Sequence, residues 1–187
     1  MTAHVHLGLV FHQHQPVGNY GFVFDELFAK SYEPLLACLE RHPGVKAGLH
    51  YSGPLLEWLV ECHPEYVERI RGLVAGGQVE MLGGGYYEPI LPAISEADRL
   101  GQPRKMGEAI ASMFGEAPSG MWLTERVWEP DLPRSIHASG YSWRLVDASN
   151  TEGGVELQPQ GWAIVFRGES ARAAGHAVTI EWSIAAC

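Results

Sequence analysis

Short apolar runs alternate with longer amphipathic segments along most of the chain, a pattern typical of an α/β protein with parallel strands. The short runs predict strands, and the longer ones, with apolar residues three and four positions apart, predict helices between them. The predicted strands are 6–11, 45–51, 79–82, 121–124 and 143–147, with a further candidate at 177–184. The predicted helices are 24–42, 54–61, 64–75, 95–114 and 130–139.

Capping residues and prolines refine the helix boundaries. Pro64 stands at a first helical position, where a missing N–H costs nothing. Ser95 with Asp98 resembles a capping box and predicts a helix start. Prolines inside two predicted helices remove a backbone donor, so we expect a kink at Pro34 and a break near Pro103.

Composition narrows the class of protein. The chain has 187 residues, 46% of them hydrophobic and 19% charged, which is typical of a soluble globular domain. A formal net charge of −9 disfavours nucleic acid and offers no basic patch for a membrane surface. The 3 widely spaced cysteines, with no secretory signal and no apolar run of membrane-spanning length, predict a cytoplasmic protein.

Polar clusters follow the predicted strands at their downstream ends. The residues concerned are His12 and His14 after the first strand, Glu80 and Glu88 in and after the third, and Glu125 after the fourth. The carboxyl ends of parallel strands meet at one rim of a sheet or barrel. We therefore expect these side chains to share one site.

The segment from Trp122 to Pro130, WLTERVWEP, carries the densest candidate chemistry. Tryptophan faces stack on sugar rings, and a positioned carboxylate such as Glu125 is the usual nucleophile or acid of glycoside chemistry. The alternative interpretation places Trp122 and Trp128 in the core and pairs Arg126 with a glutamate.

His12-Gln13-His14-Gln15-Pro16 places two imidazoles two residues apart, on one face of a continuing strand. This spacing favours hydrogen bonds from His12, His14 and Gln15 to sugar hydroxyls over a metal site. No compact set of further ligands accompanies it, so we predict no metal. Strand-end histidines bonded to the backbone are the third interpretation. His50, at the end of the second strand, is interpreted as a core residue.

The segment 77–89, GQVEMLGGGYYEP, combines a charge inside an apolar strand with a glycine-rich turn. Burying Glu80 is costly unless it is paired, which marks it as a candidate binding residue. The glycines are not a phosphate loop, because no GK[ST] follows. Tyr87 and Glu88 offer stacking and hydroxyl binding to a sugar, although a glycine turn with a surface glutamate would also explain them.

Together, HQHQP, GQVEMLGGGYYEP and WLTERVWEP resemble glycoside hydrolase family 57 in their order and spacing. The resemblance extends over residues 4–147 and is nearest to the 4-α-glucanotransferase and α-amylase branch. It implies a seven-stranded (β/α) barrel of TIM-barrel type, of which this chain supplies part. It also implies action on α-1,4-glucans or malto-oligosaccharides with retention, and no required metal or cofactor.

The same resemblance implies roles for individual residues. Glu125 takes the position of the nucleophile. His14, Glu80 and Trp122 take positions that line the donor-sugar site. Nearby positions are taken by His12, Glu88 and Trp128.

The chain also departs from the family pattern. It contains no HDDGE-like segment, which in the family supplies the acid/base aspartate. We therefore expect residues 1–147 to be the N-terminal part of a catalytic barrel and 148–187 to be a divergent tail, truncated or frame-disrupted. The isolated chain is then expected to be inactive. The alternatives are a non-catalytic carbohydrate-binding remnant and, with less support, a metal-dependent polysaccharide deacetylase.

Overall fold

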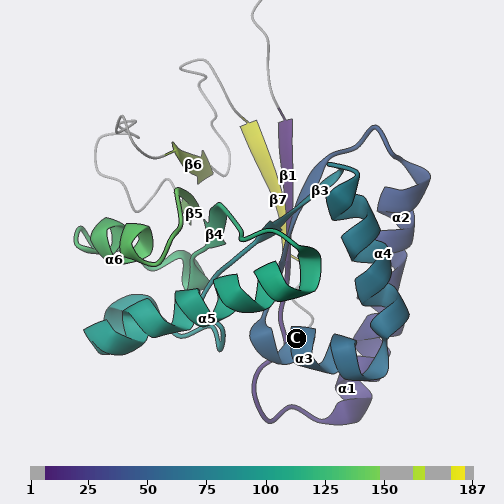
Figure 1. Ribbon diagram of the computed structural model, residues 1–187, viewed down its shortest axis with the longest axis horizontal. Coiled ribbons are helices and arrows are strands. Elements are labelled where there is room, and N and C mark those ends of the chain that lie inside the picture. Colours follow the sequence, from purple (N-terminus) through teal and green to yellow (C-terminus); the bar gives the residue numbers. More distant parts are fainter. Residues whose placement is uncertain (1–6, 148–161, 167–177, 184–187) are drawn as a thin grey trace, which may run out of the picture.

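The computed structural model describes residues 7–147, 162–166 and 178–183, and it confirms an α/β fold with parallel strands (Figure 1). The strands are β1 (Leu7–Gln13), β2 (Ala47–Tyr51), β3 (Val79–Leu82), β4 (Gly120–Trp122), β5 (Trp143–Asp147), β6 (Trp162–Phe166) and β7 (Val178–Ser183). The sequence predicted β5 with these bounds and located β7, but it did not predict β6.

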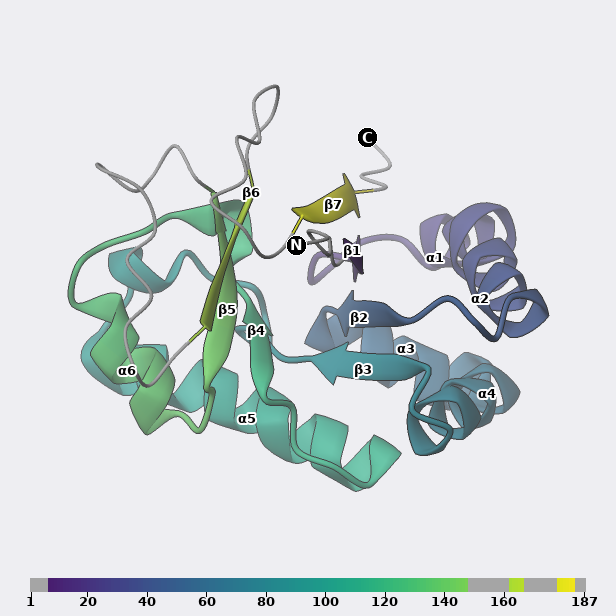
Figure 2. The same ribbon diagram turned by 90° about the horizontal axis from the view of Figure 1, so that it is seen from above.

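Hydrogen bonding divides these strands into two parallel sheets, ordered β3-β2-β1-β7 and β4-β5-β6. Because β3 ends at Leu82, it meets β4 through a single bridge between Gly83 and Met121. The two sheets stand as successive segments of one curved wall with helices outside it (Figure 2). The expected part of a closed barrel is therefore not established; the observed structure is two joined sheets.

Helices connect the strands and cover the outer side of the wall (Figure 2). Their bounds are α1 (Gly21–Leu27), a π-helical turn (Phe28–Tyr32), α2 (Glu33–Arg41), α3 (Gly53–Cys62), α4 (Pro64–Ala75), α5 (Glu96–Phe114) and α6 (Leu132–Ala138). None of the helices in the described part of the chain is long and apolar enough to cross a membrane.

Pro34 and Pro103 were both expected to distort a helix, and the structure shows a different outcome at each. The kink expected at Pro34 takes the form of the π-helical turn directly before α2. The break expected near Pro103 is wrong, because α5 runs through this residue without interruption. A proline removes only one helical hydrogen bond. Buried Met106 and Ile110 anchor the following turns, and the Tyr141 hydroxyl donates to the Pro103 carbonyl at 2.9 Å.

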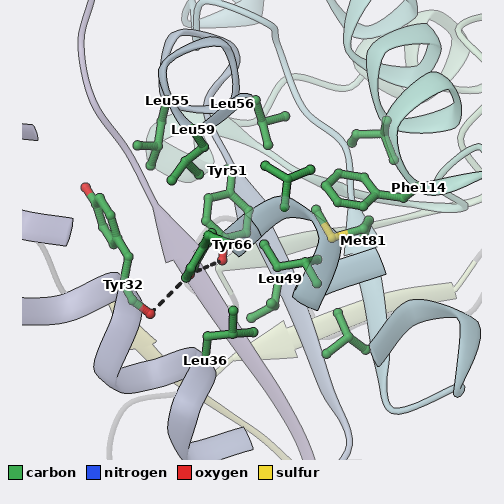
Figure 3. Close-up of a cluster of buried hydrophobic side chains, with 14 of the residues drawn as sticks. Tyr32, Leu36, Leu49, Tyr51, Leu55, Leu56, Leu59, Tyr66, Met81 and Phe114 are labelled. Carbon is green, nitrogen blue, oxygen red and sulfur yellow. Dashed lines mark hydrogen bonds between the residues drawn. The ribbon is translucent and has the colours of Figure 1, made fainter. Parts of the chain in front are cut away.

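The main hydrophobic core lies between β1–β3 and the helices outside them (Figure 3). Leu49 and Met81 point from the strands into this core, where they meet Leu59 of α3 and Phe114 of α5. Alternate residues of a strand face opposite sides of the sheet. The neighbouring positions, His50 among them, therefore face the concave side of the wall, where the polar residues gather.

Candidate active site

The ends of β1, β2 and β4 bring two histidines and a tryptophan together. His12 and His50 are register partners in adjacent strands, so their side chains lie on the same face of the sheet. The His12 ring stacks on Trp122 with 4.2 Å between centroids and 6° between planes. The His50 ring lies 4.9 Å from that of His12 and is fully buried. The result is a compact aromatic stack at the carboxyl ends of three strands.

Glu88 reaches this stack from the loop that follows β3. Its carboxylate accepts a hydrogen bond from His14 Nδ1. Glu88 Oε1 lies 3.5 Å from His50 Nδ1 and 3.8 Å from His12 Nδ1, and the two Nδ1 atoms are 2.8 Å apart. We call His12, His14, His50 and Glu88 the histidine–glutamate cluster.

Burial and charge give the members of this cluster different protonation behaviour. Burial, reinforced by the charges of His14 and Arg126, lowers the pKa of His12 to about 3. Burial likewise holds the pKa of His50 well below its ordinary value. The hydrogen bond with Glu88 raises the pKa of His14, and the charge of Glu125 acts in the same direction. His12 and His50 are therefore neutral imidazoles near pH 7, beside a strongly polarised His14–Glu88 pair.

The turn that carries Glu125 follows β4 directly and has an unusual backbone. In the short 3₁₀ turn Thr124–Arg126, Glu125 has a φ of 52° and Arg126 a φ of 54°. Glu88 has a φ of 51°, and these three are the non-glycine residues with positive φ in the described part of the chain. Such conformations cost about 1–3 kcal/mol each and concentrate at functional sites. All three occur in the loops that follow the strand ends of this site.

The structure brings together five of the residues predicted from the sequence. His12 and His14 lie beside Glu88, and Trp122 stacks on His12. The charge of Glu125 acts on both His14 and Glu88. Trp122 is only 5% exposed and its ring is stacked on His12, so it presents no free face to a ligand.

Glu80 lies apart from the cluster. It occupies the same face of the sheet as His50 but stands two register pairs earlier, opposite Gly48. Its exposed side chain accepts a hydrogen bond from Ser119 Oγ at 2.9 Å. Glu80 is thus exposed and hydrogen-bonded, so its charge within this apolar strand carries no cost of burial.

The remaining predicted residues have other surroundings. Gln15 is buried, and its amide donates to the Tyr32 hydroxyl at 2.8 Å and accepts from Asn19 at 2.7 Å. Tyr87 is 46% exposed, and its hydroxyl accepts from Lys105 at 2.7 Å. Trp128 packs against a smaller hydrophobic cluster, as the core interpretation of this residue predicted. That cluster consists of Leu91, Met121, Leu123, Leu132, Ile136 and Tyr141. The contacts of Gln15 and Trp128 are thus with other residues of the fold.

Sequence reasoning missed His50 as a member of the site. It took His50 for a core residue, and the side chain is indeed fully buried. The available signal was its position at the end of the second strand, level with the HxH pair at the end of the first. Once those strands pair in parallel, His12 and His50 become direct neighbours.

Comparison with known proteins identifies similar sequences and structures. The sequence model of glycosyl hydrolase family 57 matches residues 8–159. Alpha-amylase 1 of Dictyoglomus thermophilum is 44% identical over 147 residues, which are 79% of this chain and 21% of the relative. The 4-alpha-glucanotransferase of Thermococcus kodakarensis is 44% identical over 136 residues, which are 73% of this chain and 21% of the relative. The chain thus spans about a fifth of the length of these curated relatives.

The fold is shared with a solved enzyme structure. The crystal structure of 4-alpha-glucanotransferase from Thermococcus litoralis superposes with a TM-score of 0.74 at 41% sequence identity. The match covers 76% of this chain and 23% of that chain. Sequence and structure therefore agree on the group of proteins that this chain resembles.

Proposed function

The chain belongs to glycosyl hydrolase family 57, and from this premise we propose that it forms part of a retaining enzyme acting on α-1,4-glucans. The enzyme is of the α-amylase or 4-α-glucanotransferase type, and its substrate is an α-glucan or a malto-oligosaccharide. Residues 1–147 are the N-terminal part of a seven-stranded catalytic barrel, and residues 148–187 are a divergent tail. The names of the similar relatives support the substrate class.

The observation that carries this proposal is the position of Glu125. It stands in a strained turn three residues after Trp122, with an exposed side chain whose charge acts on His14. A retaining glycosidase needs a carboxylate that attacks the anomeric carbon and forms a glycosyl-enzyme. An exposed carboxylate in a turn directly after a strand end suits that task, and we assign it to Glu125.

The sugar is bound beside this carboxylate by the accessible part of the cluster. The His14 side chain is 37% exposed and can hydrogen-bond a hydroxyl, whereas Glu88 is 5% exposed and acts by holding His14. The Trp122 ring stacks on the His12 ring and so fixes its orientation. The exposed Glu80 side chain lies on the same face of the sheet, and we assign it a further contact with the glucan. This arrangement gives a polar binding surface that orients a sugar ring toward Glu125.

The second carboxylate of the reaction comes from outside residues 1–147. A retaining mechanism requires an acid/base about 5–5.5 Å from the nucleophile. Glu88 is 5% exposed and bound to His14, so its carboxylate is not accessible to the leaving oxygen of a sugar. The sequence contains no HDDGE-like segment to supply the aspartate. We accordingly expect the isolated chain to bind malto-oligosaccharides without turning them over.

Glucan binding is tested by nuclear magnetic resonance on the 187-residue chain with ¹⁵N-labelled histidines. Maltoheptaose should shift the imidazole signals of His14 and His12 and leave those of exposed His42 and His137 unchanged. A β-1,4-linked cello-oligosaccharide of similar length is the matched control, because it differs in linkage alone. Absence of shifts with maltoheptaose, or an equal response to both sugars, would contradict the proposed substrate.

A further inference from the structure

One oxygen of Glu88 is buried without a hydrogen-bond partner. The side chain is 5% exposed, Oε2 is bound to His14, and Oε1 has no partner among the described residues. Leaving a carboxylate oxygen unpaired in the interior costs considerable free energy. The orphaned atom is aimed at two imidazole nitrogens rather than at solvent. A positively charged partner would satisfy this oxygen.

Three potential ligand atoms form a triangle around this space. Its edges are 2.8 Å between His12 Nδ1 and His50 Nδ1, 3.5 Å from His50 Nδ1 to Glu88 Oε1, and 3.8 Å from His12 Nδ1 to Glu88 Oε1. The first edge is a hydrogen bond, which the ion would replace. Zinc binds nitrogen and oxygen ligands at about 2.0–2.2 Å in a tetrahedron, which places ligand atoms about 3.3 Å apart. The three observed edges bracket that value.

We propose that His12, His50 and Glu88 hold a divalent transition-metal ion of the zinc type. Two imidazoles and a carboxylate are ligands that Zn²⁺ accepts, whereas Ca²⁺ and Mg²⁺ favour all-oxygen sites. Glu88 Oε1 then gains the partner that it lacks in the protein alone. The fourth coordination position is left for water or another ligand.

His14 acts on this site from the outside. It binds Oε2 of Glu88 and so directs Oε1 toward the two imidazoles. Outer-shell contacts of this kind fix the orientation of ligands and contribute to metal affinity. His12, His14 and Glu88 have potential ligand atoms within 4.8 Å of one another, which places His14 near enough for this role.

The surrounding structure holds these ligands in place before any metal arrives. His12 is fixed by stacking on Trp122. His50 packs against Gly84, where a Cβ atom would come within 2.6 Å of His50 Nε2. Glu88 is held by a backbone with positive φ. A preorganised ligand set loses little conformational entropy on binding, which favours affinity.

The ion would join three segments of the fold, since its ligands come from β1, β2 and the loop after β3. The role of the ion is structural. It fixes the positions of His12, His50 and Glu88 next to His14, and the nucleophilic attack by Glu125 does not involve it. The site is therefore compatible with a reaction that has no metal requirement. The proposal stands apart from glucan binding, because metal binding is measured without sugar.

The test is metal titration of the complete 187-residue chain after removal of bound metal with a chelator. Calorimetry should show one equivalent of Zn²⁺, and Co²⁺ should give the intense visible absorption of a four-coordinate site. Glu88→Gln keeps the side-chain shape and removes the charged ligand, so affinity should fall on the order of 100-fold. His137→Ala removes an exposed histidine outside the cluster and should leave affinity unchanged.

X-ray absorption spectroscopy of the zinc-loaded wild-type chain is a second measurement, and it needs no variant. It should show two imidazoles and oxygen as ligands. The proposal is overturned by the absence of stoichiometric binding, by sulfur or fewer than two imidazoles at the metal, or by unchanged affinity in Glu88→Gln. Circular dichroism checks that the variant is folded, and if it is not, the wild-type ligand count decides.

Discussion

The two faces of the β1–β3 sheet both bury polar side chains, but they differ in which of these side chains have hydrogen-bond partners. On the helix side, Tyr51 and Tyr66 share a hydrogen bond of 2.9 Å, and the Tyr66 hydroxyl donates to the Tyr32 carbonyl at 3.1 Å (Figure 3). On the concave side, the cluster contains two of the three buried side-chain atoms without partners in the described residues, His50 Nε2 and Glu88 Oε1. The third, Gln13 Oε1, is a neutral amide oxygen on the helix side, where the Gln13 amide donates to the Tyr51 hydroxyl at 3.2 Å.

Backbone conformation reinforces the contrast. The helix side is built from regular helices and strands, whereas Glu88, Glu125 and Arg126 adopt left-handed conformations in loops on the concave side. Unpaired polar atoms and strained backbone both lower stability, and a fold retains them where a function needs them. Burial is therefore common to the two faces, and the unpaired imidazole and carboxylate atoms together with the left-handed backbone distinguish the functional face from the stabilising one.

The comparison predicts its largest effect on stability in the hydrophobic core. Leu59 of α3 is fully buried in the main core, so Leu59→Ala leaves a cavity and should lower the free energy of unfolding by about 2–5 kcal/mol. Urea denaturation followed by circular dichroism measures this change. A loss below about 1 kcal/mol would show that the helix side contributes less to stability than its packing indicates.

A smaller effect of opposite sign is expected at the strained turn. Glu125→Gly accepts a φ of 52° without steric cost and should raise the free energy of unfolding by about 1 kcal/mol, while removing the nucleophile. Glu125→Gln is the matched control, because it keeps the strained backbone and should leave stability within about 0.5 kcal/mol of wild type. Equal stability of the two variants would mean that the turn stores no strain that glycine relieves.

Much of the fold could be predicted from the sequence because local signals agree with the final structure. Pro64 and the glycines after Ala75 define α4, and the Ser95 hydroxyl accepts from the Asp98 N–H at 3.2 Å as the capping box predicts. The continuity of α5 could not be predicted in this way. It depends on buried contacts with residues distant in sequence, such as Tyr141.

The candidate site was only partly predictable for a related reason. HxH spacing and the acidic turn after β4 are local patterns, and they identified His12, His14 and Glu125. Which of Glu80 and Glu88 lies beside the histidines depends on the path of the loop after β3. That loop places Glu88 next to His14 and His50. His50 joins His12 only through strand pairing across 38 residues of sequence, a distance over which no local pattern extends.

The assignment of Glu125 is tested most directly with an activated α-glucosyl fluoride that carries a second fluorine on the sugar ring. The Glu125 carboxylate attacks the anomeric carbon, the C–F bond breaks and fluoride leaves with its electron pair, so no acid is needed. The ring fluorine slows hydrolysis of the ester. Intact mass spectrometry should show one added glycosyl group, peptide mapping should place it on Glu125, and Glu125→Gln should show none. An adduct on Glu88 or Glu129, or no adduct in a chain that binds maltoheptaose, would contradict the account.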